Sequence, residues 1–417
     1  MTDLAVIGLG YVGLPLAREA AEAGLGVVGY DENVHVVAGL NSGRSHVDDV
    51  SEAEVRAMRA AGFTATCQAA VLGAAHVVVI CVPTPLHPDG SPDLEPVCRA
   101  TRTLAPHITN GMLVVLESTT YPGTTDEVVR PVLERATGMT AGTDFHLAFS
   151  PERIDPGNRG FGLRNTPKVV GGLTPGCAQA AAAFYGKVCD TVVMAKGTRE
   201  AEMAKLLENT YRNVNIALVN ELAVAAHELN VDLWDAIACA ATKPFGFESF
   251  RPGPGVGGHC IPIDPNYLIH QARAAGAAVR LIELAQEINQ GMPAYVVRRA
   301  ADMLGGAGKS LAGATVLLAG VTYKADVSDV RETPALPIVR GLRAEQAHVT
   351  YHDPHVSGFE VDGRSVHRAG HVVRAAAAAD LTILLQPHQA YDLDAIVAAA
   401  PLALDARGCT HSGAELL

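Results

Sequence analysis

The sequence lacks the features that mark membrane, secreted and nucleic-acid-binding proteins. Its longest apolar stretch, around residues 69–82, is broken by Gly73 and His76 and falls short of the roughly 18 residues that a membrane-spanning helix needs. No basic residue precedes Arg18, whereas a secretory signal peptide begins with positive charge. The 32 basic side chains are outnumbered by 44 acidic ones, and a net charge of −12 argues against binding a phosphate backbone. We therefore expect a cytoplasmic protein without a membrane or nucleic-acid partner.

Paired cysteines and a composition typical of disorder are also missing. The eight cysteines are scattered over 417 residues with no CxxC pair, which predicts a reducing compartment and neither a disulfide framework nor a structural metal site. Apolar residues make up 48% of the chain and charged residues 18%, so buried cores can form and a disordered chain is excluded. At roughly 150 residues per domain, the length indicates two or three domains.

Short β-branched runs alternate with helical segments in both the first and the last part of the chain. The first part contains four predicted strands, at residues 4–7, 27–30, 76–82 and 112–117. The last part contains four more, at residues 315–320, 348–352, 381–385 and 402–404. Strands that alternate with helices are typical of parallel, doubly wound sheets, so each part is expected to form an α/β unit.

The segment between these units has a different texture. No glycine or proline occurs from Thr198 to Lys243, which predicts one long helix followed by a second, able to connect two domains and to form a dimerisation surface. A rigid loop rich in glycine and proline follows at 244–265. We predict an α/β protein with two Rossmann-like doubly wound sheets joined by a long central helix and a helical middle domain. The expected domains are 1–197, 198–304 and 305–417.

Three glycines between the first predicted strand and the first helix indicate a dinucleotide site. Gly8 permits a tight turn, Gly10 lets the backbone approach a pyrophosphate, and Gly13 allows close packing of helix on sheet. The helix N-terminus then offers N–H groups and partial positive charge to the phosphates. Asp31 stands 18 residues beyond Gly13, at the end of the second strand, where it can accept hydrogen bonds from a ribose and repel a 2′-phosphate. The pattern predicts NAD rather than NADP.

One of the eight cysteines differs from the rest in its surroundings. A buried cysteine is usually a small core hydrophobe, and we assign that role to the other seven. Cys260 instead follows a run of glycines and prolines at 253–258, where a ligand could approach the backbone closely. A thiol with a pKa near 8.5 is only a few per cent ionised at neutral pH and needs a cationic neighbour to become a good nucleophile.

The long helix offers such a cation. Lys205 and Asn209 are spaced i and i+4 and share one face, which Glu202 and Asn213 continue. This stripe could be a solvated face with Glu202 paired to Lys205. A lysine and an amide one turn apart are also the groups that stabilise an oxyanion beside a nucleophilic thiol, where one donor contributes about 3–4 kcal/mol to transition-state stabilisation.

Together these motifs resemble the UDP-glucose/GDP-mannose dehydrogenase family of nucleotide-sugar 6-dehydrogenases over almost the whole chain. The signatures that carry the resemblance are, in order, GLGYVG at 8–13, VPTP at 82–85, DGSPDL at 89–94, ESTTYPGTT at 117–125, SPERIDPG at 150–157, NTPKVVGG at 165–172, EMAKLLENTYRNVNIALVNELA at 202–223, GPGVGGHCIPIDPNYL at 253–268 and YKADVSDVRETPA at 323–335.

The resemblance implies that a primary C6 hydroxyl is oxidised twice, with two NAD and one water consumed. Cys260 is then the nucleophile that forms a thiohemiacetal and afterwards a thioester. Lys205 and Asn209 match the pair that stabilises the oxyanion, and Asp264 matches a base partner of the thiol. Glu152 matches the residue associated with thioester hydrolysis, and Thr119 helps to hold the catalytic water.

The resemblance also implies two sets of binding residues. Those expected to contact the cofactor are Gly8, Gly10, Tyr11, Val12, Gly13, Asp31, Thr84, Ser118, Thr119 and Arg331. Those expected to contact the UDP-sugar are Glu152, Arg153, Lys205, Asn209, Lys243, Arg251, Gly255, Gly257, Gly258, Tyr323 and Lys324. For Lys324 or Arg331 taken alone, a surface ion pair that contributes about 0–1 kcal/mol is the alternative.

The cysteine loop favours one branch of substrates. Its GHCIPxDPxYL form is similar to that of enzymes that oxidise UDP-N-acetylglucosamine or UDP-N-acetylmannosamine, whereas the UDP-glucose and GDP-mannose branches usually carry Ser and Lys where His259 and Ile263 stand here. UDP-glucose is the second choice. Two other readings remain: a two-electron hydroxyacid-type dehydrogenase, which needs no cysteine, and a nucleotide-binding sensor that has lost catalysis. We expect a homodimer or a higher homo-oligomer.

Overall fold

The computed structural model describes residues 2–154, 160–411 and 413–417. Contacts divide the chain into two compact units, Met1–Glu208 with Asn266–Ala277, and Asn209–Pro265 with Ala278–Leu417. The chain passes from the first unit to the second within one continuous helix. The expected three-part division therefore stays a prediction. Among the described residues, no helix is both long and apolar enough to cross a membrane.

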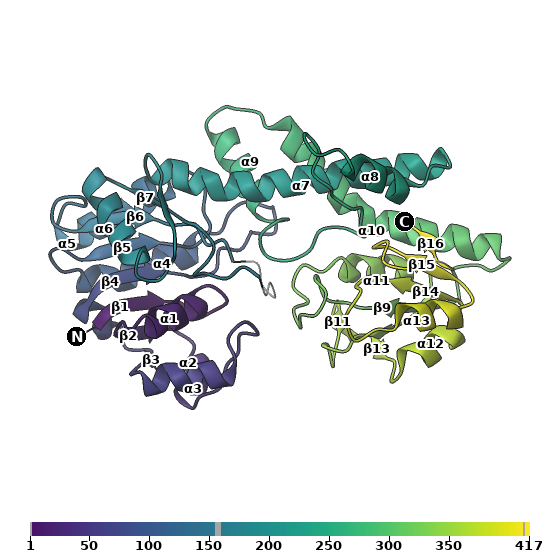
Figure 1. Cartoon of the computed structure of the whole chain (residues 1–417), viewed down its shortest axis with the longest axis horizontal. Coiled ribbons are helices and arrows are strands. Elements are labelled where there is room, and N and C mark those ends of the chain that lie inside the picture. The colour runs from purple at the N-terminus through teal and green to yellow at the C-terminus, as the bar shows by residue number, and fades with distance from the viewer. Residues whose placement is uncertain (1, 155–159, 412) are drawn as a thin grey trace. The chain divides into compact units, whose positions relative to one another are not determined.

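The first unit is built on a twisted sheet with helices on both faces (Figure 1). The described residues form eight strands in the order β3-β2-β1-β4-β5-β6-β7-β8, and only β6 and β7 pair antiparallel. The strands are β1 (Thr2–Ile7), β2 (Val27–Tyr30), β3 (Thr64–Thr66), β4 (Ala75–Ile80), β5 (Leu113–Leu116), β6 (His146–Phe149), β7 (Lys168–Gly172) and β8 (Val192–Met194). The helices are α1 (Gly13–Glu22), α2 (Val34–Asn41), α3 (Glu52–Ala60), α4 (Glu95–Leu104), α5 (Arg130–Thr137) and α6 (Pro175–Tyr185).

Alternation along the strands explains why both faces are covered. On β1, Leu4 and Val6 pack in one core with residues of α1, α3 and α6, while Ala5 and Ile7 pack in another with residues of α4 and α5. Successive side chains of a strand point to opposite faces, so an apolar run such as Leu4–Ile7 requires a helix layer on each side. The first predicted α/β unit is confirmed.

The second unit repeats this architecture with a smaller sheet (Figure 1). Its described residues form a parallel sheet of six strands in the order β13-β10-β9-β14-β15-β16, and β11 and β12 form a separate hairpin. The strands are β9 (Thr315–Ala319), β10 (His348–His352), β11 (Glu360–Val361), β12 (Arg364–Ser365), β13 (His367–Arg368), β14 (Leu381–Leu384), β15 (Ala403–Asp405) and β16 (Glu415–Leu416). Helices α10 (Arg280–Gly306) and α11 (Ala335–Ala344) cover one face, and α12 (Val372–Ala378) and α13 (Leu393–Ala399) the other.

The predicted long helix is also confirmed, with a break that the sequence did not mark by glycine or proline. Helix α7 runs over Thr198–Glu228 and α8 over Leu233–Ala241. Asn230 makes the break by adopting a left-handed conformation at φ 52°, and the Asp232 carboxylate then caps α8 by accepting N–H bonds from Trp234 and Asp235. Helix α9 (Asp264–Ala274) follows the glycine- and proline-rich loop.

Candidate active site

The three glycines after β1 have distinct structural roles. Gly8 has φ 90°, and a Cβ there would lie 2.6 Å from the Cys81 carbonyl oxygen. A Cβ at Gly13 would lie 1.9 Å from the Gly8 carbonyl oxygen. Among the described residues other than Gly10 and its two chain neighbours, no heavy atom lies within 4 Å of the Cβ position at Gly10. Gly8 and Gly13 are therefore required by the turn and by packing, while Gly10 leaves the backbone open to a ligand.

Asp31 closes this turn at the end of β2. One carboxylate oxygen accepts the Leu9 N–H at 2.9 Å and the other accepts the Asn33 N–H at 2.8 Å. A cavity of about 160 Å³ adjoins the turn. Its lining residues are Ile7, Gly8, Tyr30, Asp31, Glu32, Val82, Pro83, Pro96, Arg99 and Ala100. An open glycine, a helix N-terminus and a fixed carboxylate at the carboxyl end of parallel strands are the parts that a dinucleotide needs, so these residues fit NAD.

A larger cavity of about 370 Å³ lies elsewhere in the first unit, beside the starts of α6 and α7. Of the residues singled out above, it contains none. The residues expected to carry the chemistry therefore do not line this cavity.

The segment after β5 carries Ser118 and Thr119 and is fastened to α7. The Ser118 hydroxyl donates to the Val82 carbonyl oxygen at 2.8 Å. The fully buried Glu202 carboxylate accepts the Gly123 N–H at 2.6 Å, and from Thr125 the N–H at 2.9 Å and the hydroxyl at 2.7 Å. Burial raises the pKa of Glu202 to about 7, against these three donors. Sequence reasoning placed Glu202 only in a helical stripe and missed this anchoring role.

Glu152 follows β6 and is held by the backbone next to it. One of its oxygens accepts the N–H groups of Arg153, at 2.6 Å, and of Ile154. Burial raises the pKa of Glu152, while these donors and the positive charge of Lys205 oppose the rise. The Arg153 guanidinium pairs with Glu208 at 2.7 Å. The last three positions of the SPERIDPG motif, 155–157, lie outside the described residues.

The polar stripe on α7 is buried, which excludes the reading of a solvated face. Glu202, Lys205, Asn209 and Asn213 are all less than a tenth exposed. A buried lysine and two buried amides require polar partners, because unpaired polar groups are costly away from water. These four side chains therefore form hydrogen bonds or ion pairs inside the protein and do not simply face solvent.

Three residues of the predicted chemistry are linked within the second unit. The Asn209 amide donates to the Asp264 carboxylate, which is 2% exposed and begins α9. The Asp264 N–H donates to the Cys260 carbonyl oxygen at 2.8 Å. The Cys260 side chain is exposed. The thiol therefore stands on a turn fixed by its neighbours, and Asn213 supports that turn through a hydrogen bond to the Ile261 carbonyl oxygen at 3.3 Å.

The glycines of the cysteine loop are used by the protein's own packing. A Cβ at Gly257 or Gly258 would lie 2.8 Å or 2.9 Å from atoms of the Tyr323 side chain. Gly255 has φ 126° and Gly258 has φ 89°, a region that favours glycine. We expected these positions to admit a ligand, and the structure instead places Tyr323 against two of them. Their contact with substrate stays a prediction.

Tyr323 and Lys324 lie after β9 on a segment braced from two neighbouring strands. The Val321 N–H donates to the Asp353 carboxylate at 2.7 Å, after β10. The Gln386 side chain, after β14, donates to the Thr322 carbonyl oxygen at 2.9 Å. The carboxyl ends of β9, β10 and β14 thus hold this segment at the point where the strand order reverses, which is where open α/β sheets bind ligands.

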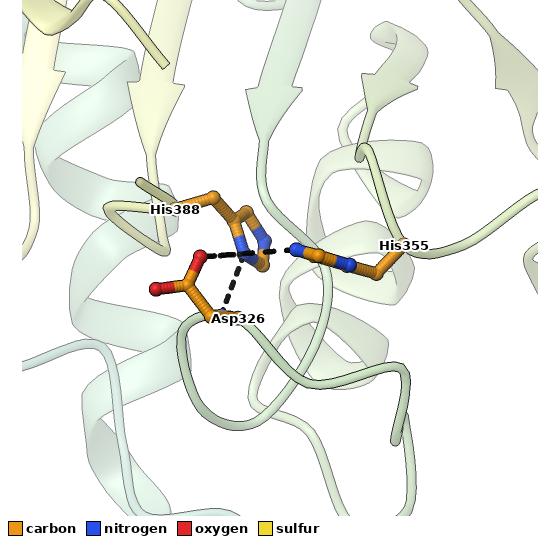
Figure 2. Close-up of side chains that lie close together, drawn as sticks. All are labelled: Asp326, His355 and His388. Carbon is orange, nitrogen blue, oxygen red and sulfur yellow. Dashed lines mark hydrogen bonds and ion pairs between the residues drawn. The ribbon is translucent and has the colours of Figure 1, made fainter. Parts of the chain in front are cut away.

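The side chains of Asp326, His355 and His388 lie close together next to this segment, as Figure 2 shows. The ligand-type atoms of these side chains lie within 4.8 Å of one another. However, Nδ1 of His388 accepts the backbone N–H of Asp326 at 2.9 Å, and its Nε2 lies 3.0 Å from the Asp353 carboxylate. Both ring nitrogens of His388 therefore already have polar partners, and neither is left to bind a metal. His388 is better described as a hydrogen-bonded support of the Tyr323 segment.

The other predicted residues of the second unit, Arg331, Lys243 and Arg251, lie at its surface. Both oxygens of Asp329 are bonded by the Arg331 guanidinium, at 2.6–3.0 Å. Burial raises the pKa of Asp329, but Arg331 outweighs it and the net pKa is lowered. Lys243 and Arg251 are exposed, and the Lys243 ammonium lies 5.1 Å from the centre of the Phe245 ring.

The structure thus groups the predicted residues by unit. In the first unit Glu152 lies within the electrostatic influence of Lys205, and Thr84, Ser118 and Thr119 follow neighbouring strands. In the second, Cys260, Asn209 and Asp264 are linked.

Four supporting residues could not be assigned from the sequence, namely Glu117, Lys168, Glu202 and His388. The first two could have been noticed as charged residues that border buried β runs in the ESTTYPGTT and NTPKVVGG motifs.

Similarity to known proteins extends over most of the chain. The UDP-glucose/GDP-mannose dehydrogenase family matches in three parts, as the NAD binding domain over residues 2–189, the central domain over 199–291 and the UDP binding domain over 317–412. The UDP-N-acetyl-D-glucosamine 6-dehydrogenase of Pseudomonas aeruginosa is 39% identical over 360 residues, 86% of this chain and 84% of that protein.

Two solved structures are similar in fold. The UDP-N-acetyl-mannosamine dehydrogenase of Pyrococcus horikoshii superposes with a TM-score of 0.91 at 33% identity, over 100% of this chain and 99% of that one. A UDP-glucose dehydrogenase from Pyrobaculum islandicum gives a TM-score of 0.87 at 26% identity, over 100% of this chain and 96% of that one.

Proposed function

The chain belongs to the UDP-glucose/GDP-mannose dehydrogenase family and is an NAD-dependent nucleotide-sugar dehydrogenase, and on that premise we propose that it oxidises the C6 hydroxyl of a UDP-N-acetylhexosamine to a carboxylate. The GHCIPxDPxYL form of the cysteine loop supports this choice of sugar. So do the names of similar proteins from Pseudomonas aeruginosa and Pyrococcus horikoshii, which are dehydrogenases of UDP-N-acetylglucosamine and UDP-N-acetylmannosamine. UDP-glucose is the second candidate, supported by the fold shared with a UDP-glucose dehydrogenase.

The nucleophile of the proposed mechanism is Cys260. NAD, when bound, supplies the hydride acceptor for each of the two oxidations. The Cys260 thiolate adds to the C6 aldehyde left by the first oxidation, and loss of hydride from the resulting thiohemiacetal gives a thioester. A thiol makes the second oxidation a hydride transfer rather than the oxidation of a hydrate. The observation that carries this assignment is the Asn209–Asp264–Cys260 linkage, since it fixes the backbone of a residue with an exposed thiol four positions before a buried aspartate.

The proposed stabilisers of the oxyanion are Lys205 and Asn209, one turn apart on α7. The Asn209 amide carries two hydrogens, so its bond to Asp264 leaves a second donor for substrate. Lys205 can also act as an acid or base, and Asp264 as the base partner of the thiol. Glu152 is assigned to hydrolysis of the thioester, with Thr119 holding the water.

The nucleotide of the sugar is assigned to the second unit. Tyr323 and Lys324 follow β9, in the region that matches the family's UDP binding domain. Because hydrogen bonds with Asp353 and Gln386 hold this segment in place, we assign it to positioning the nucleotide and not to the chemical steps. Arg153, Lys243, Arg251 and the loop glycines are further proposed contacts of the sugar or diphosphate, and Arg331 a contact of the cofactor.

We also propose that the enzyme is a homodimer, or a higher oligomer built from dimers. One face of α7 exposes large apolar side chains at helical spacing, namely Met203, Leu207, Tyr211, Leu218 and Leu222, and we call these five residues the α7 stripe. Their exposed fractions run from 36% to 59%. A contiguous apolar stripe of this length is typical of an interface. The eight cysteines, scattered along the chain without a CxxC pair, support a reducing cytoplasmic location, and the product fits a precursor of polysaccharide or glycoconjugate synthesis.

The decisive experiment measures NADH formed per sugar consumed, with UDP-N-acetylglucosamine, UDP-N-acetylmannosamine and UDP-glucose in parallel. Two NADH with one preferred N-acetylated sugar is the expected result. One NADH would mean that the reaction stops at the aldehyde and would remove Cys260 and Glu152 from their roles. No NADH from any of the three, with NAD still bound, would favour a nucleotide-binding sensor.

A further inference from the structure

A buried lysine lies directly behind Glu152 in the first unit, and none of the roles above uses it. Lys168 opens β7, and its side chain is 3% exposed. Its ammonium is paired with the Glu117 carboxylate, whose side chain is fully buried, and lies 3.5 Å from the Glu152 carboxylate. Glu117 follows β5 and Glu152 follows β6, so three adjacent strands bring the cation and both carboxylates together.

The two oxygens of Glu152 have different partners. One accepts the backbone N–H groups of Arg153 and Ile154, and the other is the oxygen nearest Lys168. Glu117 is held from the far side by Tyr185, whose hydroxyl donates to it at 3.3 Å, and by the Cys81 thiol at 3.8 Å. Lys168 is therefore held by a fixed counter-ion on one side and faces Glu152 on the other.

The other titratable groups around Lys168 carry little charge of their own. Burial raises the pKa of the Cys81 thiol well above its usual range and that of Cys189 to about 11, and it also raises the pKa of Tyr185, so all three stay neutral at working pH. Lys205 adds a second positive charge at longer range. The local balance is therefore set by Glu117, Glu152 and Lys168, which together carry one negative charge when all three are ionised.

A purely structural ion pair explains less of this arrangement. Two paired charges in a dry interior contribute little net stability, because desolvation offsets their attraction. Glu152 lies 3.5 Å from the Lys168 ammonium, so its ionisation depends on the charges of both members of the pair. Glu152 is also the residue assigned to the hydrolytic step.

We propose that Lys168 is a positioning residue that holds Glu152 ionised and oriented for hydrolysis of the Cys260 thioester, and that Glu117 limits the strength of its effect. This inference rests on the proposed function. In the hydrolytic step Glu152 takes a proton from water as the water oxygen bonds to the acyl carbon. The C–S bond then breaks, the Cys260 thiolate leaves with the electron pair, and the proton passes from Glu152 to solvent. Glu152 can accept that proton only in its ionised form.

The two neighbours should act on Glu152 with opposite signs. Methionine has a similar bulk to lysine but no charge, so Lys168→Met should raise the pKa of Glu152. Glu152 then stays protonated up to a higher pH, and hydrolysis should start only at that higher pH. The variant Glu117→Gln removes a negative charge, so hydrolysis should start at lower pH than in the unaltered enzyme. Loss of packing alone would impair both variants in the same direction.

The experiment mixes enzyme rapidly with NAD and the preferred UDP-sugar at a series of pH values, records NADH, and detects the acyl-enzyme by intact mass. For Lys168→Met at neutral pH we expect a burst close to two NADH per active site. A steady state slowed at least ~10-fold should follow, with the thioester accumulated. Lys168→Arg keeps the positive charge and should restore the steady state. Burial lowers the pKa of Lys168 to about 8, so hydrolysis by the unaltered enzyme should fall above that pH and the arginine variant should lack this fall.

The outcomes distinguish a failure of the proposed function from a failure of the proposed role of Lys168. If the unaltered enzyme does not form two NADH, the proposed function fails. If it does, and the pH profile of hydrolysis is the same in Lys168→Met, or moves the same way in Lys168→Met and Glu117→Gln, the role of Lys168 is overturned. Should the methionine variant fail to fold, the arginine and Glu117→Gln variants still decide, because each has its own expected displacement of the profile.

Discussion

The side-chain amide of Asn209 donates a hydrogen bond to the carboxylate of Asp264. The helix that carries Asn209 begins far upstream of the cysteine loop, and this bond ties the two together within the second unit. Since the Asp264 N–H also donates to the Cys260 carbonyl oxygen, the position of the thiol depends on α7 through two consecutive hydrogen bonds. The backbone of the nucleophile is thereby held in one position, although the loop around it is irregular and rich in glycine.

Replacing Cys260 by serine should abolish net turnover and leave NAD affinity within about twofold. A serine hydroxyl is hardly ionised at neutral pH, so it cannot take over the covalent step, and we expect a loss of at least ~100-fold in kcat. The matched control is Cys239→Ser, because Cys239 is also exposed but lies on α8. Steady-state NADH formation and fluorescence titration with NAD measure the two quantities. Normal turnover in Cys260→Ser would remove Cys260 as the nucleophile.

Replacing Asp31 by serine should relax the preference for NAD over NADP. The carboxylate beside the dinucleotide turn repels a 2′-phosphate, so its removal should raise the ratio of kcat/KM for NADP over NAD by at least ~10-fold. Asp31 also accepts the Leu9 N–H, and Asp31→Asn keeps an acceptor there without the charge. Both variants should therefore shift the ratio, and an unchanged ratio would take Asp31 out of the ribose site.

The glycine turn allows a test that separates ligand contact from folding. A Cβ at Gly10 would contact no described residue beyond its chain neighbours, so Gly10→Ala should keep its urea midpoint but weaken NAD binding at least ~10-fold by occupying the space of the pyrophosphate. A Cβ at Gly13 collides with the Gly8 carbonyl oxygen, so Gly13→Ala should lower the free energy of unfolding by about 2–4 kcal/mol. Equal loss of stability in both variants would contradict this division of roles.

The local parts of this site could be predicted from sequence and the long-range parts could not. The turn that contains Gly8, Gly10 and Gly13, and the position of Asp31 after the next strand, could be predicted because the whole strand–turn–helix–strand pattern lies in one short stretch of sequence. Glu202 could not be linked to the Gly123 segment, since 79 positions separate the bonded groups and only the fold brings them together.

The cysteine loop illustrates a second limit, since the neighbours of its glycines could not be predicted from the sequence. Its glycines are visible in the sequence, and they were interpreted as room for a ligand. The structure fills the space at Gly257 and Gly258 with Tyr323, which lies more than sixty positions away. A glycine reports that something approaches the backbone closely, but the identity of that neighbour is set by tertiary packing.

The α7 stripe should hold two copies of the chain together. Leu218 is 53% exposed, and an aspartate there would place a charge in the proposed interface. Leu218→Asp should therefore shift the mass measured by light scattering from dimer to monomer at micromolar protein concentration. Val34→Asp is the matched control, because Val34 is 61% exposed on α2, outside the stripe. A monomeric unaltered protein, or a dimer that survives Leu218→Asp, would rule out this interface.

Glu202 should make the stability of the protein depend on pH in a direction that is unusual for a carboxylate. Its pKa is raised by burial to about 7 from an ordinary value of 4.5, so the folded state holds the proton more tightly than the unfolded state does. Below about pH 4.5 both states are protonated and nothing is lost. As pH rises from about 4.5 towards 7, the unfolded state releases its proton while the folded state keeps it, so up to about 3 kcal/mol of unfolding free energy should disappear.

The variant Glu202→Gln cannot titrate, so it should lack this part of the pH dependence. Its amide oxygen can keep the bonds from Thr125, but its NH₂ group then faces the Gly123 N–H, so the variant should be less stable than the unaltered protein at pH 5. The deficit should shrink at pH 8, where the buried carboxylate of the unaltered protein is charged. Urea midpoints at the two pH values measure this difference, and Glu221→Gln, on the exposed side of the same helix, is the control. An identical pH dependence in Glu202→Gln and the unaltered protein would show that Glu202 is ionised throughout, with its three donors outweighing burial.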